Sequence, residues 1–523
     1  MDISKYIILL LVCSFHIQNS YGKFKILAIM PFNGKSHFFV SDVLFEALAQ
    51  RGNDVTVLSH FPKKTPVKNY HDISMSMEDD AGIHKINMEH VTSTFPFFTL
   101  KELFESGLQK ICREGLSHPN VQKLLKSKEH YDVIIIEMFN TDCFLGFVHK
   151  FQASLIFIRT STLPIWLSER TGNPENPSYI PGTTSGNPSR MSFLQRLDNI
   201  IYYINYKLLY WFYNKRCEAV AREHFGDDMP NLLDIARNAS FYLINSYFVH
   251  QYPKPLLPNT KEIAGMHVKE PKKLPQDLEN WISGATHGLI YFNLGSMLRI
   301  STMAEDKRLA FLESFAQLPH RVLMKWEEKE NTADIPDNVK LTTWSPQNDV
   351  LHHPNVKLFI THGGMLGTVE AVHAGVPMIA IPFYGDQLTN VVLLEERGLG
   401  IALRYKDISF ETINRTLHKV LYDPGYARRA KDMSAAFRDR PISPLDEAIH
   451  WVEYVARHKG TAAESLLQSP AHELAFYQYL LLDVLAVLLL GLLIIFFSVC
   501  LVGRFLTRVM AVRCRGTSEK KTK

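Results

Sequence analysis

The sequence predicts an α/β protein built from two domains, and three observations lead to this prediction. Apolar, β-branched runs alternate with amphipathic segments along most of the chain, a pattern typical of parallel sheets covered by helices. These runs are apolar throughout instead of alternating, as in strands that are buried on both faces. The 523 residues also exceed the roughly 100–200 residues that a single domain usually holds.

The expected strands fall into two groups, one in each half of the chain. In the first half they lie at residues 24–30, 54–59, 131–136 and 155–158. In the second half they lie at residues 289–294, 322–326, 340–343, 358–361 and 378–381. The proline-rich residues 253–275 predict a linker between the halves. The first domain therefore covers residues 23–252 and the second covers 276–440, while residues 441–479 form C-terminal helices and a membrane-proximal segment.

Both ends of the chain carry apolar segments. Residues 1–22 hold an apolar run from Tyr6 to Phe15 and end at Ser20-Tyr21-Gly22, and we interpret them as a secretory signal peptide. Residues 480–503 are almost unbroken apolar sequence, as long as the roughly 20 residues that a helix needs to cross a bilayer. We therefore predict a single transmembrane helix there.

The charge of the chain follows this topology. The tail, residues 504–523, holds seven basic residues and one acidic residue, which is typical of the cytosolic side of a membrane. Because the whole chain carries +4 and the tail alone carries +6, the rest of the chain is slightly acidic at −2. The sequence thus predicts a type I single-pass protein whose two domains are lumenal, and it gives no reason to expect nucleic acid as a partner.

Two further patterns refine the location. Lys520 and Lys521 stand near the C-terminus and resemble the di-lysine signal that returns membrane proteins to the endoplasmic reticulum, an address read by a receptor. Asn238 and Asn414 each begin an N-glycosylation triplet. We therefore expect a protein of the endoplasmic reticulum membrane with a short cytosolic tail.

The composition excludes several classes of protein. Charged residues make up 21% and hydrophobic residues 46%, close to ordinary globular usage, which excludes a disordered chain, a coiled coil, a collagen-like chain and a polytopic membrane protein. Six cysteines are too few for a disulfide scaffold. Cys112, Cys143 and Cys217 remain between the two ends, and we interpret them mostly as small buried residues without a metal-binding spacing.

Residues 200–212 are unusually rich in aromatic side chains. Three interpretations stay open for this segment. It lines an apolar pocket, it rests on the membrane surface, or it is a helix buried between the domains.

The strongest motif spans residues 359–387, FITHGGMLGTVEAVHAGVPMIAIPFYGDQ. It predicts a strand, a turn that contains Gly363 and Gly364, and a helix that begins near Leu366. Such a turn presents backbone N–H groups and a positive helix end to a phosphate, although a glycine pair alone more often marks a tight connection.

The whole stretch resembles the signature of the UDP-dependent glycosyltransferases, which it matches at Thr361, His362, Gly364, Glu370, Pro377, Pro382, Asp386 and Gln387. Residues 344–347 and 293–296 also match that family, and residues 139–150 look most like its insect members. The resemblance implies a GT-B fold, in which two Rossmann-like domains face each other across a cleft. The second domain would hold the UDP-sugar and the first the acceptor.

The resemblance also implies donor-binding roles. Trp344 would stack on uracil, Gln347 would contact the nucleoside, and Glu370 would accept hydrogen bonds from the ribose. The two phosphates would be surrounded by Ser296, His362, Gly364, Gly367 and Thr368, and the sugar hydroxyls would be held by Asp386 and Gln387. The chain departs from many relatives at Leu366, where Asn is common, and at Gly367, where Ser is common.

No metal or other cofactor is expected. The chain has no Asp-x-Asp motif, which metal-dependent sugar transferases of the other main architecture use to hold a divalent ion, and it shows no clustered ligands with metal-site spacing. Leaving UDP would instead be stabilised by a helix N-terminus, by His362 and by hydroxyl donors.

Transfer with inversion needs a base for the acceptor hydroxyl, and His37 occupies the family's base position after the first strand. A carboxylate should orient the imidazole, as in catalytic triads. Two candidates follow the strand at residues 131–136. The sequence of residues 140–143 resembles that of the insect members and favours Asp142, which could also cap a helix. The alternative is Glu137.

We therefore expect an inverting glycosyltransferase that moves a sugar, with glucose favoured by the insect-like resemblance, to a hydroxyl of small lipophilic acceptors in detoxification or in pigment or hormone conjugation. The rival is a membrane-bound binding protein on a GT-B fold that has lost catalysis. A Rossmann oxidoreductase is disfavoured, because no G-x-G-x-x-G follows the first strand of either half. The sequence leaves open whether the chain forms a homo- or hetero-oligomer.

Overall fold

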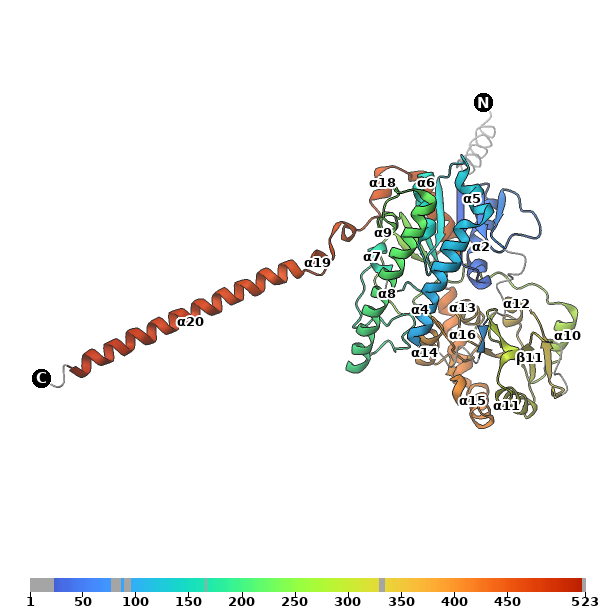
Figure 1. Ribbon diagram of the computed structural model, residues 1–523. Coiled ribbons are helices and arrows are strands. Elements are labelled where there is room, and N and C mark those ends of the chain that lie inside the picture. Colours follow the sequence, from blue (N-terminus) through green and yellow to red (C-terminus); the bar gives the residue numbers. More distant parts are fainter. Residues whose placement is uncertain (1–22, 77–85, 89–95, 165–166, 329–333, 520–523) are drawn as a thin grey trace, which may run out of the picture. The chain divides into compact units, whose positions relative to one another are not determined.

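The computed structural model describes residues 23–76, 86–88, 96–164, 167–328 and 334–519 (Figure 1). The predicted signal peptide, residues 1–22, and the di-lysine end of the tail, residues 520–523, lie outside the described residues. The chain divides into a compact unit, Met1–Gln468, and a C-terminal unit, Ser469–Lys523.

The first half forms a seven-stranded sheet in the order β3-β2-β1-β5-β6-β7-β8, and all its neighbouring strands are parallel. Its strands are β1 (Lys25–Met30), β2 (Asp54–Ser59), β3 (Tyr70–Ser74), β5 (Val133–Glu137), β6 (Ser154–Arg159), β7 (Phe241–Ile244) and β8 (Thr260–Glu262). Its helical elements are α2 (Lys35–Gln50), α4 (Pro96–Ser106), the π-helix η1 (Gly107–Gly115), α5 (Pro119–Lys126), the 3₁₀ turn η2 (Cys143–Leu145), α6 (Gly146–Phe151), α7 (Ser168–Thr171), α8 (Phe193–Phe225) and α9 (Leu232–Arg237).

The second half forms a six-stranded parallel sheet in the order β12-β11-β9-β13-β14-β15. Its strands are β9 (Leu289–Asn293), β11 (Arg321–Lys325), β12 (Val339–Thr342), β13 (Val356–Thr361), β14 (Met378–Ala380) and β15 (Gly400–Ala402). Its helices are α10 (Gln276–Ser283), α11 (Glu305–Ala316), α12 (Gln347–Leu351), α13 (Met365–Ala374), α14 (Gln387–Glu396), α15 (Phe410–Tyr422) and α16 (Pro424–Arg438).

The predicted strands all form, with ends that shift by up to two residues, and the α/β prediction is confirmed. The structure adds strands that the sequence did not indicate. β3 was missed because its sequence, YHDIS, is polar and only its first residue is buried, as befits an edge strand. β8 has three residues and lies inside residues 253–275, so part of the expected linker belongs to the first sheet.

Each sheet is buried on both faces, which explains why its strands are apolar throughout. In β1, Leu27 and Ile29 pack into one core cluster, and Ile26, Ala28 and Met30 pack into the other. Helix α17 (Pro444–His458) joins the second of these clusters and packs against α2. Part of the segment expected to lead to the membrane therefore completes the first domain.

A short strand pair joins the two halves of the compact unit. β4 (Ile86–Asn87) runs parallel to β10 (Leu298–Arg299), and the next residue, Met88, is buried in the core of the second half. The backbone N–H of Met88 donates to Thr302 Oγ1 at 3.1 Å. These contacts connect the first domain directly to the loop that follows β9.

The aromatic segment at residues 200–212 lies in α8, a helix of 33 residues that contacts α4 (Figure 1). A capping box between Ser192 and Gln195 fixes its N-terminus. One face is buried, with Tyr206, Tyr210 and Tyr213 pointing inward, and the opposite face is exposed and largely apolar.

The C-terminal unit contains α20 (Leu482–Glu519). Within residues Leu482–Val512 of this helix, an 18-residue window has a mean hydropathy of 3.2, and by length and composition these residues could cross a membrane. The candidate span covers nearly all of the predicted residues 480–503 and continues helically into the basic tail.

Candidate active site

The candidate catalytic residues lie where the strand order of the first sheet reverses. β1 lies between β2 and β5, so the chain leaves β1 and β5 in opposite directions. Such a reversal opens a crevice at the carboxyl ends of parallel strands, where open α/β sheets bind ligands. His37 lies in the first turn of α2 after β1, and Glu137 is the last residue of β5. The topology therefore brings the two residues together across 100 positions of sequence.

His37 and Glu137 form a close pair. His37 Nδ1 lies 2.5 Å from Glu137 Oε1, and Thr160 Oγ1 lies 3.0 Å from the same nitrogen. The side chain of Glu137 is fully buried, whereas that of His37 is 23% exposed. The rings of Phe32 and Phe139 pack against the imidazole at centroid distances of 4.7 Å. The carboxylate thus fixes the orientation of the ring through Nδ1, and the side chain stays partly accessible.

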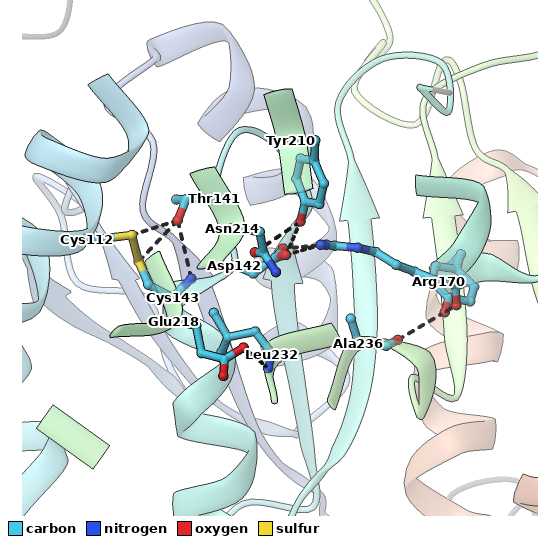
Figure 2. A network of polar contacts seen from close by, with 11 residues as sticks. Cys112, Thr141, Asp142, Cys143, Arg170, Tyr210, Asn214, Glu218, Leu232 and Ala236 are labelled. Atoms are coloured by element: carbon cyan, nitrogen blue, oxygen red, sulfur yellow. Dashed lines mark hydrogen bonds and ion pairs between the residues drawn. A yellow bond between two sulfur atoms is a disulfide. The ribbon is translucent and has the colours of Figure 1, made fainter. Parts of the chain in front are cut away.

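Asp142, the preferred carboxylate in the sequence analysis, lies elsewhere (Figure 2). Its Oδ1 accepts a hydrogen bond of 2.5 Å from Arg170 Nη1, and its Oδ2 is contacted by Arg170 Nη2 and by the Tyr210 hydroxyl. Both side chains of this ion pair are almost completely buried. The expected pairing of Asp142 with His37 is therefore wrong in this structure, because Asp142 is held by Arg170 and the alternative, Glu137, contacts the imidazole.

The cysteines beside Asp142 also differ from expectation. Cys112 of η1 and Cys143 are joined by a disulfide, with their Cα atoms 5.7 Å apart (Figure 2). Their spacing of 31 residues gave no signal in the sequence, because the pairing depends on how η1 packs beside the loop after β5. Cys217 stays a free, buried thiol as predicted.

A cavity of about 1340 Å³ lies between the two sheets of the compact unit and receives side chains from both. It contains most of the residues that the sequence nominated. Those that line it are His37, Ser296, Trp344, Gln347, His362, Gly364, Gly367, Glu370, Asp386 and Gln387. Thr368 lies buried just behind the wall, as Glu137 does on the other side.

One end of the cavity suits a nucleoside. Gln347 Nε2 donates to Glu370 Oε2 at 2.5 Å, and Gln347 Oε1 accepts from Asn293 Nδ2 at 2.8 Å. Burial raises the pKa of Glu370 to about 7, so hydroxyl groups that donate to this carboxylate would favour its charged form. Trp344 is 48% exposed at the cavity wall. The expected stacking and ribose contacts fit this arrangement.

The adjoining wall suits a diphosphate. It lies at the reversal point of the second sheet, where β9 and β13 leave in opposite directions. Gly363, with φ of 78°, turns the chain after β13 so that α13 begins at Met365 and directs its N-terminus into the cavity. Burial lowers the pKa of His362 to about 4, so it offers a neutral ring. His362 Nδ1 and Thr368 Oγ1 are buried with no hydrogen-bond partner among the described residues.

Two lysines at this wall were missed by the sequence analysis. Lys325, the last residue of β11, is almost fully buried and donates to the Gly295 carbonyl at 2.5 Å, and burial lowers its pKa to about 8. Lys35 Nζ lies 4.0 Å from the centroid of the Trp344 ring. The signal that could have identified Lys325 from the sequence is its position at the carboxyl end of a buried strand. Both cations line the cavity and add positive potential where a diphosphate would lie.

The part of the cavity where the sequence analysis places the sugar is formed at the start of α14. Gln387 is buried, and its Oε1 accepts from the backbone N–H groups of Phe383 and Tyr384 at 2.8 and 3.2 Å. Asp386 is flanked by the positive charges of Arg159 and His37, which oppose the rise in its pKa caused by burial. Arg159, another residue missed from the sequence, lines the cavity and interacts electrostatically with both Glu137 and Asp386.

The remaining part of the cavity is walled by α8 and by the loop 182–186. Tyr202 and Tyr206 line the cavity, and the hydroxyl of Tyr206 lies 3.0 Å from Thr184 Oγ1. Thr389 of α14 fastens this loop to the second domain. Its hydroxyl donates to the Gly182 carbonyl at 3.0 Å and accepts from the Gly186 N–H at 3.3 Å.

The described residues contain no group of three or more His, Cys, Asp or Glu side chains arranged to hold a metal ion. The expectation of a metal-independent reaction stays a prediction.

Comparison with known proteins agrees with this geometry. The family model described as "UDP-glucoronosyl and UDP-glucosyl transferase" matches residues 25–516. UDP-glycosyltransferase UGT5 of Dactylopius coccus is 41% identical over 498 residues, covering 92% of this chain and 93% of the relative. UDP-glucuronosyltransferase 2B13 of Oryctolagus cuniculus is 32% identical over 479 residues, covering 87% of this chain and 88% of the relative.

Among solved structures, the glycosyltransferase of kitacinnamycin superposes with a TM-score of 0.54 at 14% identity, covering 83% of this chain and 98% of that one. Spinosyn forosaminyltransferase SpnP gives a TM-score of 0.53 at 16% identity, covering 83% and 100%. These likenesses confirm the GT-B fold. The chain therefore belongs to the UDP-glycosyltransferase family, and it is an enzyme that uses a UDP-sugar donor and an acceptor.

Proposed function

We propose that the enzyme transfers glucose from UDP-glucose, with inversion at the anomeric carbon, to a hydroxyl of small lipophilic acceptors. The observation that carries this proposal is the contact between His37 and Glu137 on the wall of a cavity whose other wall holds the donor residues. The apolar wall formed by α8, with Tyr202 and Tyr206, suits phenolic or steroidal acceptors. Such an activity would serve detoxification or the conjugation of pigments or hormones.

In the proposed step, His37 Nε2 takes the proton from the acceptor hydroxyl as the oxygen attacks the anomeric carbon. The bond from that carbon to the diphosphate oxygen breaks, and UDP leaves with the electron pair. Glu137 accepts the hydrogen bond from Nδ1–H, keeps the correct tautomer and stabilises the imidazolium that forms. Negative charge that develops on UDP is met by the N-terminus of α13, by His362 and by Lys325.

Glucose is favoured over glucuronate by the relatives. UDP-glucosyltransferase 2 of Dactylopius coccus is 38% identical to this chain over 491 residues, whereas the mammalian UDP-glucuronosyltransferases are 30–32% identical. The residues that line the sugar end would hold neutral hydroxyl groups through Asp386 and Gln387.

We infer a location in the endoplasmic reticulum membrane, with the two domains in the lumen and the basic tail in the cytosol. The candidate span at Leu482–Val512 and the basic residues that follow it support this topology. Asn238 is exposed, whereas Asn414 is half-buried and its Nδ2 lies 3.4 Å from Gln317 Oε1. Asn238 is therefore the more accessible of the two predicted glycosylation sites.

A screen of UDP-glucose, UDP-glucuronate and UDP-N-acetylglucosamine against phenols, steroids and pigments tests the proposal. The enzyme is assayed in membranes, and products are identified by mass, with a His37→Ala variant as the control. We expect a hexose adduct of a phenolic acceptor with UDP-glucose. Preferential formation of glucuronides would contradict the choice of sugar, and an absence of transfer from every donor would contradict the function.

A further inference from the structure

Helix α14 carries the proposed sugar residues at its start and contacts the first domain further along. Asp386 is its N-cap residue and Gln387 its first helical residue, and both line the cavity. Thr389 is bonded to the loop 182–186 of the first domain, and Glu396 Oε1 accepts from the Ser189 N–H at 3.0 Å. The helix therefore lies between the cavity wall and the first domain, where one side chain can contact both.

Asn390 is such a residue of α14, and it is almost completely buried, with 3% of its surface exposed. Its Nδ2 donates to the carbonyl of Gly363 at 3.0 Å and to Asp386 Oδ2 at 3.3 Å. Gly363 lies in the turn that directs the N-terminus of α13 into the cavity. One amide group therefore holds both the turn at the diphosphate wall and the carboxylate at the start of α14.

Gln251 completes the hydrogen bonds of Asn390 from the first domain. It lies between β7 and β8, two strands of the first sheet, and is 2% exposed. The Gly363 carbonyl and the Asp386 carboxylate can only accept, so Nδ2 of Asn390 must face them and its Oδ1 needs a donor. Gln251 Nε2 supplies that donor at 3.1 Å. Arg397, at the end of α14, holds the same segment by donating through Nη2 to the carbonyl of Gln251.

We propose that Gln251 and Asn390, which we call the amide pair, are positioning residues for the sugar of the UDP-sugar, because they orient the Asp386 carboxylate while the first domain contacts α14. The inference rests on the proposed role of Asp386 in holding sugar hydroxyls. Without Gln251, the amide of Asn390 is free to rotate, and Asp386 loses a hydrogen bond of the stronger, charge-assisted kind. Contact between the two domains is thereby coupled to the grip on the sugar.

The amide pair should matter less for the nucleotide than for the sugar. The expected nucleoside residues all belong to the second domain. The turn at Gly363 has further supports, since its N–H donates to Thr361 Oγ1 at 3.3 Å and a Cβ atom placed on Gly363 would lie 2.6 Å from Val391 Cγ1. This close packing against α14 should keep the turn in place after the loss of one hydrogen bond.

The test compares the binding of UDP and of UDP-glucose to the full chain in detergent by calorimetry, where the stoichiometry for UDP counts the folded molecules. Gln251→Met and Asn390→Leu each remove an amide and nearly keep the side-chain size. We expect the Kd for UDP-glucose to rise roughly tenfold in each variant, while the Kd for UDP stays within about twofold. Thr389→Val is the matched control, because its hydrogen bonds join α14 to the first domain through Gly182 and Gly186. It should leave the ratio of the two Kd values unchanged.

Asp386→Asn separates the inference from the function on which it rests. If this variant raises the Kd ratio but neither amide variant does, the amide pair is not a positioning device and the sugar role of Asp386 stands. If Asp386→Asn leaves the ratio unchanged, the sugar role itself is contradicted, and the inference is overturned with it.

The double variant Gln251→Met, Asn390→Leu tests whether the two amides act in one chain of contacts. Since the first loss already releases Asp386, the double variant should raise the Kd ratio by no more than about twofold beyond the larger single effect. Two effects that multiply would show that the residues act independently and would overturn the proposal. So would an equal loss of affinity for UDP and UDP-glucose, which indicates a general structural role.

Discussion

Replacing Glu137 by Gln and Asp142 by Asn should separate a catalytic carboxylate from a structural one. Gln keeps the size of Glu137 and an oxygen that can accept from His37 Nδ1, so the ring position should survive. The change removes the negative charge that faces the imidazolium in the transition state. With charges about 4 Å apart and an effective dielectric constant near 20, that interaction is worth about 4 kcal/mol. At about 1.4 kcal/mol per factor of ten, kcat should fall roughly a thousandfold.

The Asp142→Asn change should act on stability instead. The ion pair between Asp142 and Arg170 is buried, with side-chain exposures of 4% and 1%. Removing one partner of a buried pair leaves an uncompensated charge and typically costs about 3–5 kcal/mol. The free energy of unfolding should fall by that amount, while kcat per folded molecule changes little.

The assay combines single-turnover sugar transfer with thermal unfolding of the same preparations, and UDP binding reports the folded fraction. We expect Glu137→Gln to lose rate and keep its Tm, and Asp142→Asn to lose Tm and keep its rate. If Glu137→Gln retained more than about a tenth of the rate, or if Asp142→Asn lost the rate at an unchanged Tm, the assignment of the pair would be refuted.

Three other outcomes are expected. Thr389→Val removes two hydrogen bonds that hold the loop 182–186 to α14, so kcat should fall roughly tenfold at an unchanged affinity for UDP. Thr389→Ser should restore kcat. Equal rates in both variants would contradict a role of these hydrogen bonds in catalysis. Replacing Cys112 and Cys143 by Ala opens a loop closed over 31 residues and should lower the free energy of unfolding by about 3–4 kcal/mol, measured in urea against the Cys217→Ala control. Burial lowers the pKa to about 3 for His250 and to about 4 for His267, His362 and His373. The unfolded chain binds these protons at pH values below about 6.5, whereas the folded chain does not. The free energy of unfolding should therefore fall by up to about 1.4 kcal/mol per pH unit for each His as the pH drops from 6.5 to about 4. A free energy of unfolding that stays constant in this range would contradict the prediction.

The alternation of strands and helices could be predicted from the sequence, because strands in sheets that are covered on both faces are apolar throughout. Nine runs of β-branched residues therefore mark strands that form. Two of the missed strands, β3 and β8, are polar or short edge strands whose pairing depends on a neighbour. A third, β7, is apolar and lies inside the sheet, but it has only four residues. The packing of α17 against the first domain could not be predicted either, because the apolar face of a helix carries no feature that identifies the sheet it covers.

The donor wall was readable because its residues cluster in one segment, where strand, turn and helix succeed one another. The residues that were missed come from separate strands. Lys325 and Arg159 end β11 and β6, and only the three-dimensional register places them in the cavity. The choice between Glu137 and Asp142 failed for a similar reason. The two lie five residues apart, and the partner that decides the role of Asp142 is Arg170, from another part of the chain.

The account depends most directly on His37 as the base. Sugar transfer by His37→Ala should be measured with UDP-glucose and a phenolic acceptor, beside calorimetric binding of UDP to the same protein. We expect transfer to disappear while the affinity for UDP stays within about twofold of the unmodified enzyme, because His37 belongs to the first domain and the nucleoside residues to the second. Turnover at an undiminished rate in this variant would contradict the account.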